Sequence, residues 1–174
     1  MKPVAIAIIG SQDSGKTTVI ETLIRALARR GYEVAAAKHI REPNFTIDTK
    51  GKDTWRFAHA GAKTVLGVSS EELTTIEKVR IEEVTLLMIL EKCKSSDVVF
   101  LEGFRNIVAN DDTLPKIAVI TSAEEAREAV LKFRPLLALT GPYSSEELGL
   151  SVAYVDVLKN PETLADMVEN RIRH

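Results

Sequence analysis

The sequence predicts an α/β fold in which a mostly parallel sheet is flanked by helices, and two patterns carry this prediction. An apolar run at residues 4–9 passes through a glycine-rich turn into helical spacing that ends near Arg30, and a strand pattern follows at 32–38. A strand, a helix and a second strand in this order are typical of parallel sheets. Residues 98–101 and 117–120 are short and wholly apolar, as the interior strands of such sheets are.

The middle of the chain is predicted to form a segment that lies outside this sheet. Residues 40–52 are polar and indicate a loop or a short hairpin. A helical pattern over 53–60 ends at Gly61. Two strand patterns, at 63–69 and 73–78, are divided by Ser-Ser-Glu-Glu, which predicts a β-hairpin.

The rest of the chain continues the alternation of helices and strands. Apolar spacing predicts a second long and well-buried helix over 81–90. Ser122 with Glu125 fits a capping box, and Asn160-Pro161 fits an N-cap followed by proline, so helices are expected to begin at both places. Further strands are expected at 136–139 and 152–157.

The composition bounds the class of protein. The 174 residues are 45% hydrophobic and 28% charged, with a net charge of -2, and no linker divides them, so we expect one domain over 1–174. This charge balance gives no reason to expect nucleic acid or a membrane as a partner. Cys93 is the only cysteine, which excludes an internal disulfide and favours a reducing, cytoplasmic location. Residues 1–9 lack the features of a signal peptide, and no apolar run approaches the ~20 residues of a membrane span.

The turn after the first strand, G-S-Q-D-S-G-K-T, has the spacing of a phosphate-binding loop. Gly10 and Gly15 allow the backbone amides to point at phosphate oxygens, and the following helix adds its positive dipole end. Lys16 can reach the β- and γ-phosphates, and Thr17 can place its hydroxyl on Mg²⁺. The fold predicted is therefore P-loop NTPase-like, as a single nucleotide-binding domain. The residues expected to bind the nucleotide here are Gly10, Ser11, Asp13, Ser14, Gly15, Lys16, Thr17 and Thr18.

Asp13 is unusual within such a loop, because a carboxylate that faces bound phosphates is repelled by several like charges. Its side chain is therefore expected to point outward.

Glu102 directly follows the apolar strand pattern at 98–101. An acid at this place in a phosphate-loop protein can hold Mg²⁺, directly or through water, or orient the attacking water. Gly103 after it permits a close approach of the backbone to the ligand. The alternative is a surface acid at a strand end. We predict catalytic roles for Lys16, Glu102 and Asp53.

Polar residues near the same edge of the sheet complete the predicted site. The segment D-T-K-G-K-D supplies Asp48 and Asp53, either of which can complete a magnesium shell, and Thr17, Asp48 and Glu102 are the predicted ligands. Alternatively, Asp53 is the N-cap of the next helix. Lys38 and His39 lie at the end of a predicted strand, where ligands bind in open α/β sheets. Lys38 can neutralise phosphate charge, and His39 is either a phosphate donor or a structural histidine.

The chain contains, in this order, G-S-Q-D-S-G-K-T-T, Lys38-His39, D-T-K-G-K-D followed by His59-Ala60-Gly61-Ala62, L-E-G-F-R and Pro115-Lys116-Ile117. Over roughly residues 4–120 these motifs together resemble the family of molybdopterin-guanine dinucleotide biosynthesis adaptor proteins, MobB. The resemblance implies a GTP-binding homodimer with weak, Mg²⁺-dependent GTPase activity. It also implies that the protein assists the molybdenum cofactor guanylyltransferase that attaches GMP to molybdopterin. On this resemblance Lys38, His39, Asp48, Lys52, Asp53 and Glu102 line the rest of the nucleotide site.

The sequence itself does not choose between GTP and ATP, since no [NT]-K-x-D element is present. Backbone groups of Thr140-Gly141-Pro142 are a candidate contact for the base. A small-molecule kinase and an ATP-binding accessory protein are the alternative functions. Against a kinase, the arginines Arg41, Arg56 and Arg105 are scattered and form no lid segment. A subunit that binds nucleotide only for its stability is a third hypothesis.

Overall fold

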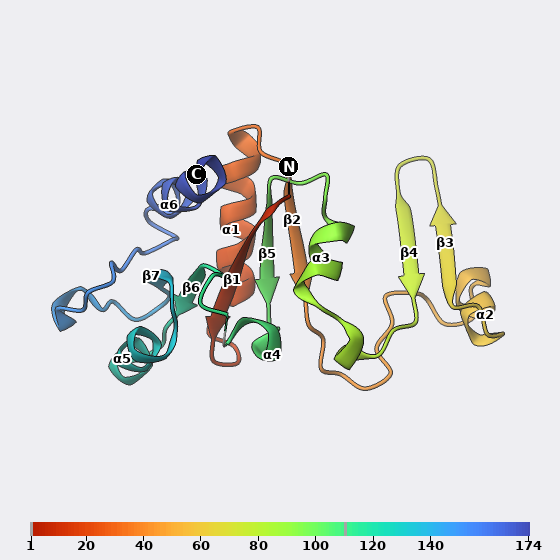
Figure 1. The fold of residues 1–174 in the computed structure, drawn as a ribbon, viewed down its shortest axis with the longest axis horizontal. Helices are drawn as coiled ribbons and strands as arrows, with labels where there is room; N and C mark the ends of the chain where they lie inside the picture. The colour runs from red at the N-terminus through yellow and green to blue at the C-terminus, as the bar shows by residue number, and fades with distance from the viewer. Residues whose placement is uncertain (1, 110) are drawn as a thin grey trace. The chain divides into compact units, whose positions relative to one another are not determined.

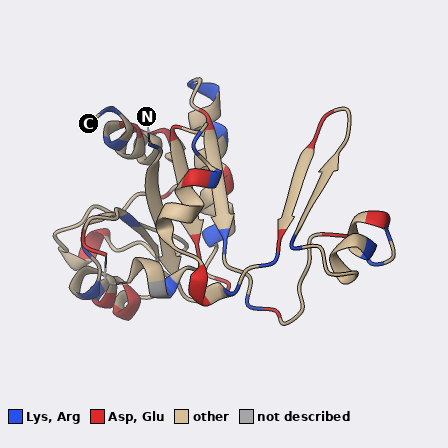
Figure 2. Ribbon diagram, turned by 45° about the vertical axis from the view of Figure 1, so that its right-hand side comes forward, with Lys and Arg blue, Asp and Glu red and all other residues tan. Residues whose placement is uncertain are grey.

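The computed structural model describes residues 2–109 and 111–174. The chain divides into two compact units, and each is described by itself. The first contains the residues up to His39 together with Leu86–His174, and the second is Ile40–Thr85. The expectation of one domain over 1–174 stays a prediction. Acidic and basic residues are interspersed along both units (Figure 2). Among the residues described, none of the helices has the length and apolar character needed to cross a bilayer.

The first unit is built on a five-stranded sheet, in which every strand pairs in parallel with its neighbours (Figure 1). The order is β2-β5-β1-β6-β7. This confirms the predicted α/β fold and its parallel sheet. The strands are β1 (Val4–Gly10), β2 (Val34–Lys38), β5 (Val98–Glu102), β6 (Lys116–Val119) and β7 (Leu136–Thr140).

The central position of β1 brings residues from distant parts of the sequence to its carboxyl end. Ile8 lies in register with Glu102 on β5, and Gly10 lies in register with Val119 on β6. On the far side of β5, Lys38 is in register with Glu102. The ends of β1, β2 and β5 therefore lie at one edge of the sheet, where the phosphate-binding loop begins.

Helices cover the sheet of the first unit, and the apolar stripes of α1 and α6 pack on one of its faces (Figure 1). Leu23 and Leu27 of α1 and Leu164 of α6 are fully buried in the same cluster as Ile8 and Phe100 of the strands. An amphipathic helix is stabilised mainly by such burial, so this packing holds the first turn of α1 at the sheet edge. The helices are α1 (Lys16–Arg29), α3 (Leu86–Lys92), α4 (Arg105–Val108), α5 (Ala123–Lys132), η2 (Glu146–Leu148) and α6 (Pro161–Arg173).

The second unit contains the predicted hairpin. Its elements are α2 (Asp53–His59), β3 (Thr64–Val68), β4 (Leu73–Glu77) and η1 (Ile81–Glu83). The two strands are antiparallel, with Val65 opposite Ile76 and Val68 opposite Leu73. Helix α2 lies against β3, where Gly67 faces Thr54. Residues 40–52 form neither helix nor strand, as the loop interpretation predicted.

Two expectations about elements were wrong. The long helix over 81–90 is divided, because Val84 is extended and α3 begins only at Leu86. Val84 and Thr85 are β-branched, which lowers their helix propensity at this point. The helix is also less buried than predicted, since the Leu87 side chain is 65% exposed. In place of a strand over 152–157, Tyr154 forms a single bridge to Leu139.

Candidate functional site

The glycine-rich loop joins β1 to α1 in a conformation that its glycines make possible. Gly15 precedes α1 with a left-handed φ of 97°. At Gly10, a Cβ atom would lie 2.5 Å from the Val119 carbonyl oxygen and 2.8 Å from Ser14 Oγ, so no larger residue fits. The loop therefore curls tightly against the end of β6. Asp13 also has a positive φ, of 57°, and is exposed, in keeping with a side chain that points outward.

Lys16 folds back over this loop. Its ammonium donates to the Ser11 carbonyl oxygen and lies 3.5 Å from Ser14 Oγ. Burial lowers the pKa of Lys16, and the negative charges of Glu102 and Asp13 oppose that shift. The ammonium is thus held by neutral acceptors of the loop, which are weaker partners than the charged oxygens of a phosphate.

Glu102 is the centre of the site at the sheet edge. Its side chain, 12% exposed, ends β5 and faces two donors. One carboxylate oxygen, Oε2, accepts a hydrogen bond from Thr17 Oγ1 at 3.2 Å. The other, Oε1, lies 3.1 Å from Lys38 Nζ. The structure therefore brings together three predicted site residues from α1, β2 and β5.

His39 connects the ends of β2 and β5. Its backbone amide donates to the Glu102 carbonyl at 2.9 Å, and its Nδ1 lies 3.2 Å from the Gly103 carbonyl oxygen. A carbonyl can only accept, so Nδ1 carries the proton of this bond. The imidazole ring lies 5.8 Å from the ring of Phe104. These contacts favour the structural role for His39.

Gly103 makes this close approach of the two strand ends possible. It has a φ of 85°, and a Cβ atom here would lie 3.2 Å from the His39 carbonyl oxygen. A residue with a side chain would be strained in this conformation and would press on the end of β2.

Glu125 is a site residue that the sequence analysis missed. Its Oε2 accepts hydrogen bonds from the Thr121 amide at 2.6 Å and from the Thr121 hydroxyl at 2.8 Å. Burial alone would raise the pKa of Glu125, but hydrogen bonds from Thr121 and Ser11 and the charge of Lys16 hold it below its usual value of 4.5. The carboxylate thus links the loop after β6 to the phosphate-binding loop.

The capping-box pattern at Ser122 and Glu125 was the one feature of the sequence that drew attention to Glu125. Its Ser122 half is confirmed, since Ser122 Oγ accepts from the Glu125 amide at 3.2 Å. The Glu125 carboxylate, however, bonds to Thr121 one residue earlier and not to the Ser122 amide that the motif implies.

Asp48, Lys52 and Asp53 belong to the second unit, so their place in the nucleotide site stays a prediction. Asp48 Oδ1 accepts from the Thr49 amide and the Thr54 hydroxyl, whereas its buried Oδ2 has no hydrogen-bond partner among the described residues. Asp53 is not the N-cap of α2, because Lys52 takes that position and Asp53 is the first helical residue. A negative charge in the first turn still stabilises the helix through its dipole.

The end of β7 lies beside the end of β6, at the position of the predicted base contact. Gly141 packs so tightly that a Cβ atom would lie 2.5 Å from the Ile120 carbonyl oxygen. The Gly141 carbonyl already accepts a hydrogen bond from Tyr154 Oη at 2.8 Å. The Thr140 hydroxyl is fully buried and, within the described residues, has no partner. Recognition of a base at Thr140-Gly141-Pro142 stays a prediction.

The oxygen donors at the sheet edge fit Mg²⁺. Thr17 and Glu102 supply one hydroxyl and one carboxylate, which are the hard ligands that this ion prefers. No group of three or more His, Cys, Asp or Glu side chains in the described part of the chain is arranged to hold a metal by itself. Mg²⁺ in nucleotide sites characteristically takes one or two protein oxygens and completes its shell with phosphates and water.

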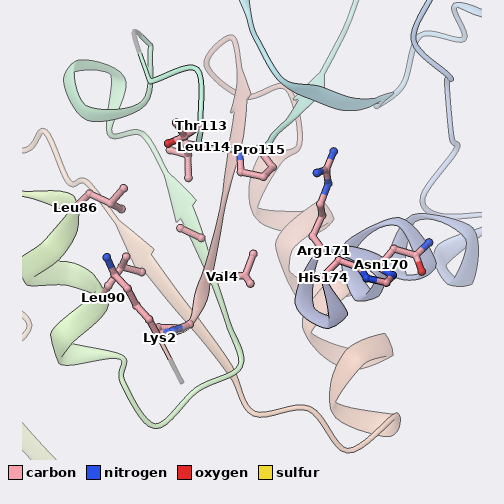
Figure 3. A pocket seen from close by; sticks show the side chains of 12 residues that line it. Lys2, Val4, Leu86, Leu90, Thr113, Leu114, Pro115, Asn170, Arg171 and His174 are labelled. Carbon is pink, nitrogen blue, oxygen red and sulfur yellow. The ribbon is translucent and has the colours of Figure 1, made fainter.

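A groove of about 720 Å³ lies away from these residues, at the opposite edge of the sheet (Figure 3). It is lined by the start of β1, by α3 and by the end of α6, including Val4, Leu90 and Arg171. Val4 begins the strand whose other end forms the phosphate-binding loop. The groove is therefore not part of the candidate nucleotide site.

Comparisons with known proteins agree on one family. Residues 5–140 match the family model MobB, described as molybdopterin guanine dinucleotide synthesis protein B. A relative from Haemophilus influenzae, named molybdopterin-guanine dinucleotide biosynthesis adapter protein, is 29% identical over 176 residues, which cover 97% of this chain and 89% of the relative. A second relative, from Methanocaldococcus jannaschii, is 34% identical over 116 residues. That match covers 66% of this chain but only 46% of the relative's length.

A solved structure shows the same fold. The crystal structure of a molybdopterin-guanine biosynthesis protein B (mobB) is 25% identical to this chain and has a TM-score of 0.73. The match covers 98% of this chain and all of that one.

Proposed function

Because the chain belongs to the MobB family, we propose that it works as a GTP-binding adapter in molybdopterin guanine dinucleotide biosynthesis. In this role it assists, in the cytoplasm, the molybdenum cofactor guanylyltransferase that attaches GMP to molybdopterin. The observation that carries the nucleotide site is the pairing of Thr17 with Glu102 at 3.2 Å, directly after a glycine loop whose lysine folds inward. Backbone amides at a helix N-terminus and an ammonium suit phosphates, and hard oxygen ligands suit a hydrated Mg²⁺.

The residues of the site have distinct roles on this proposal. Lys16 leaves the Ser11 carbonyl and binds the β- and γ-phosphates, which are stronger acceptors. Thr17 and Glu102 hold Mg²⁺, which would neutralise charge on the phosphates when bound. Both carboxylate oxygens of Glu102 are already engaged, by Thr17 and Lys38, so neither is free to orient an attacking water. We therefore expect hydrolysis to be slow, and nucleotide occupancy to matter more than turnover.

Nucleotide preference is tested by calorimetry with Mg²⁺, in the presence and absence of the guanylyltransferase. We expect Mg²⁺-GTP to bind with roughly micromolar affinity and Mg²⁺-ATP to bind more weakly. Tight binding of ATP without GTP binding would contradict the guanine assignment. Fast transfer of the γ-phosphoryl group to a small acceptor would instead support a P-loop kinase.

A homodimer is the second part of the proposal, and the hairpin of the second unit supports it. Leu66, Val68 and Leu73 lie on one face of β3 and β4 and are 61%, 77% and 68% exposed. An isolated two-stranded sheet is only marginally stable in water, and an exposed apolar face of this kind is characteristic of an interaction site.

Substitution Val68→Lys is expected to shift this dimer towards monomer, because the symmetric interface would bring together one buried charge from each copy. Sedimentation velocity over a range of protein concentrations measures the shift. Leu158→Lys is the matched control, since Leu158 is a 70% exposed apolar residue of the first unit. A wild-type chain that is monomeric at every concentration would rule out the dimer.

A further inference from the structure

The Glu102 carboxylate has both oxygens engaged before any ligand arrives. Thr17 donates to Oε2, and the Lys38 ammonium lies 3.1 Å from Oε1. The two side chains differ in character, because Lys38 is 55% exposed whereas Glu102 is 12% exposed. A carboxylate this buried is stabilised by a positive partner, and Lys38 provides that charge.

The backbone around this pair is fixed more firmly than the lysine side chain. Lys38 and Glu102 are in register on neighbouring strands, and the next residue, His39, bonds to the Glu102 and Gly103 carbonyls. The Lys38 side chain, in contrast, is long and half exposed. The ammonium can therefore leave Glu102 by rotation of its side chain while both strands stay in place.

A divalent cation at Thr17 and Glu102 changes the charge balance of this pair. Lys38 and Glu102 together are neutral, so Mg²⁺ beside the same carboxylate meets the repulsion of the ammonium. Mg²⁺ therefore weakens the pairing of Lys38 with Glu102. By thermodynamic reciprocity, Lys38 weakens the binding of Mg²⁺ to the same degree.

We propose that Lys38 is a built-in counter-ion that Mg²⁺ displaces from Glu102, so that this lysine sets the Mg²⁺ dependence of nucleotide binding. The inference rests on the proposed function, because it requires a Mg²⁺-nucleotide at the loop. Burial is the main cause of the lowered pKa of Lys16, and the positive charge of Lys38 lies close enough to lower that pKa further. Its charge is thus also available to the phosphates when Mg²⁺ is absent.

The test compares the affinity for a fluorescent GTP analogue, mant-GTP, in Mg²⁺ and in EDTA. The ratio of the two affinities is the Mg²⁺ stimulation. In Lys38→Met, the affinity in EDTA is expected to fall because a positive charge near the phosphates is lost. The stimulation ratio is expected to rise about tenfold, because the ammonium no longer repels Mg²⁺. Solvent partly screens that repulsion in the wild type, which limits the size of the rise. Lys38→Arg keeps the charge and should stay near the wild-type ratio.

Two further variants isolate the mechanism. Lys94→Met removes another lysine that is ion-paired at 2.9 Å, to Glu91, on the surface away from the loop, and should leave the ratio unchanged. In a Glu102→Gln background, Lys38→Met should alter the ratio less than it does in the wild type, because the carboxylate that Lys38 and Mg²⁺ share has lost its charge. Urea unfolding of each variant verifies that the fold is retained.

The outcomes separate this inference from the proposed function. An equal loss of affinity in Mg²⁺ and EDTA would make Lys38 a simple phosphate ligand and overturn the counter-ion role. Unchanged affinities in both media would overturn it too, and would leave Lys38 as one half of a structural ion pair. If the wild-type chain binds no mant-GTP in either medium, the proposed nucleotide function fails, and the inference fails with it.

Discussion

Replacing Lys16 with alanine is expected to weaken the binding of Mg²⁺-GTP by at least about 100-fold, since a charge-assisted contact to phosphate is worth about 3 kcal/mol. The ammonium is already inside the loop, where it bonds to the Ser11 carbonyl. Without the ammonium, the conformation of the loop still depends on its glycines and on the contact of Gly10 with β6. Calorimetry with Mg²⁺-GTP measures the loss.

Lys159→Ala is the control for this experiment, because the Lys159 side chain is 81% exposed and pairs with Asp156, three residues earlier in the sequence. Unchanged nucleotide affinity in Lys16→Ala would show that the phosphates bind elsewhere. If Lys16→Ala loses nucleotide binding but still stimulates the guanylyltransferase fully, the result would support the hypothesis that nucleotide serves only the stability of this protein.

Substitution Lys116→Met is expected to lower the free energy of unfolding by about 3 kcal/mol, the largest stability change we foresee for a residue outside the site. Lys116 is fully buried at the start of β6. Its ammonium donates to the carbonyls of Asp111, Leu114 and Arg134 at 2.6, 2.9 and 2.7 Å. Methionine fills a similar volume but leaves three acceptors without their donor. Urea unfolding with an unchanged m-value measures the difference.

Lys132→Met is the matched control, because that lysine is 62% exposed and pairs with Glu128 on the same helix. A change below about 0.5 kcal/mol in Lys116→Met would contradict the structural role assigned to these bonds.

The difference in the free energy of unfolding between the wild type and Lys116→Met depends on pH with a definite sign. Burial lowers the pKa of Lys116 below 10.5, although Asp111 and Asp112 oppose the shift. Between the folded pKa and 10.5 the unfolded chain binds more protons, so the stability of the wild type rises with pH in this window. The variant lacks this contribution, and the difference between the two proteins should therefore grow towards pH 10.5.

Local signals in the sequence predicted most of the fold. The loop and α1 are specified by glycine positions and by one apolar stripe, and the hairpin is specified by alternation around Ser-Ser-Glu-Glu. The same kind of evidence failed at Val84, where two β-branched residues interrupt an otherwise helical pattern. It also failed around Tyr154, where apolar composition predicted a full strand and the structure has one bridge.

The site was harder to predict, because its contacts depend on strand order. Thr17 and Glu102 were expected to share a role, but the pairing of Lys38 with Glu102 follows from β2 lying next to β5, which no local pattern encodes. Glu125 was expected only to cap a helix. Its link to the loop depends on β6 lying beside β1.

The order β2-β5-β1 also has a consequence for how the chain folds. Residues 40–85 lie between β2 and β5 in sequence, so the sheet closes a loop that contains the whole second unit. Loop-closure entropy grows only logarithmically, and doubling such a loop lowers stability by about 0.6 kcal/mol. Rates respond more strongly, because contacts between residues distant in sequence slow folding. Insertions in the second unit should therefore change stability little, while assembly of the nucleotide site becomes a late and slow event in folding.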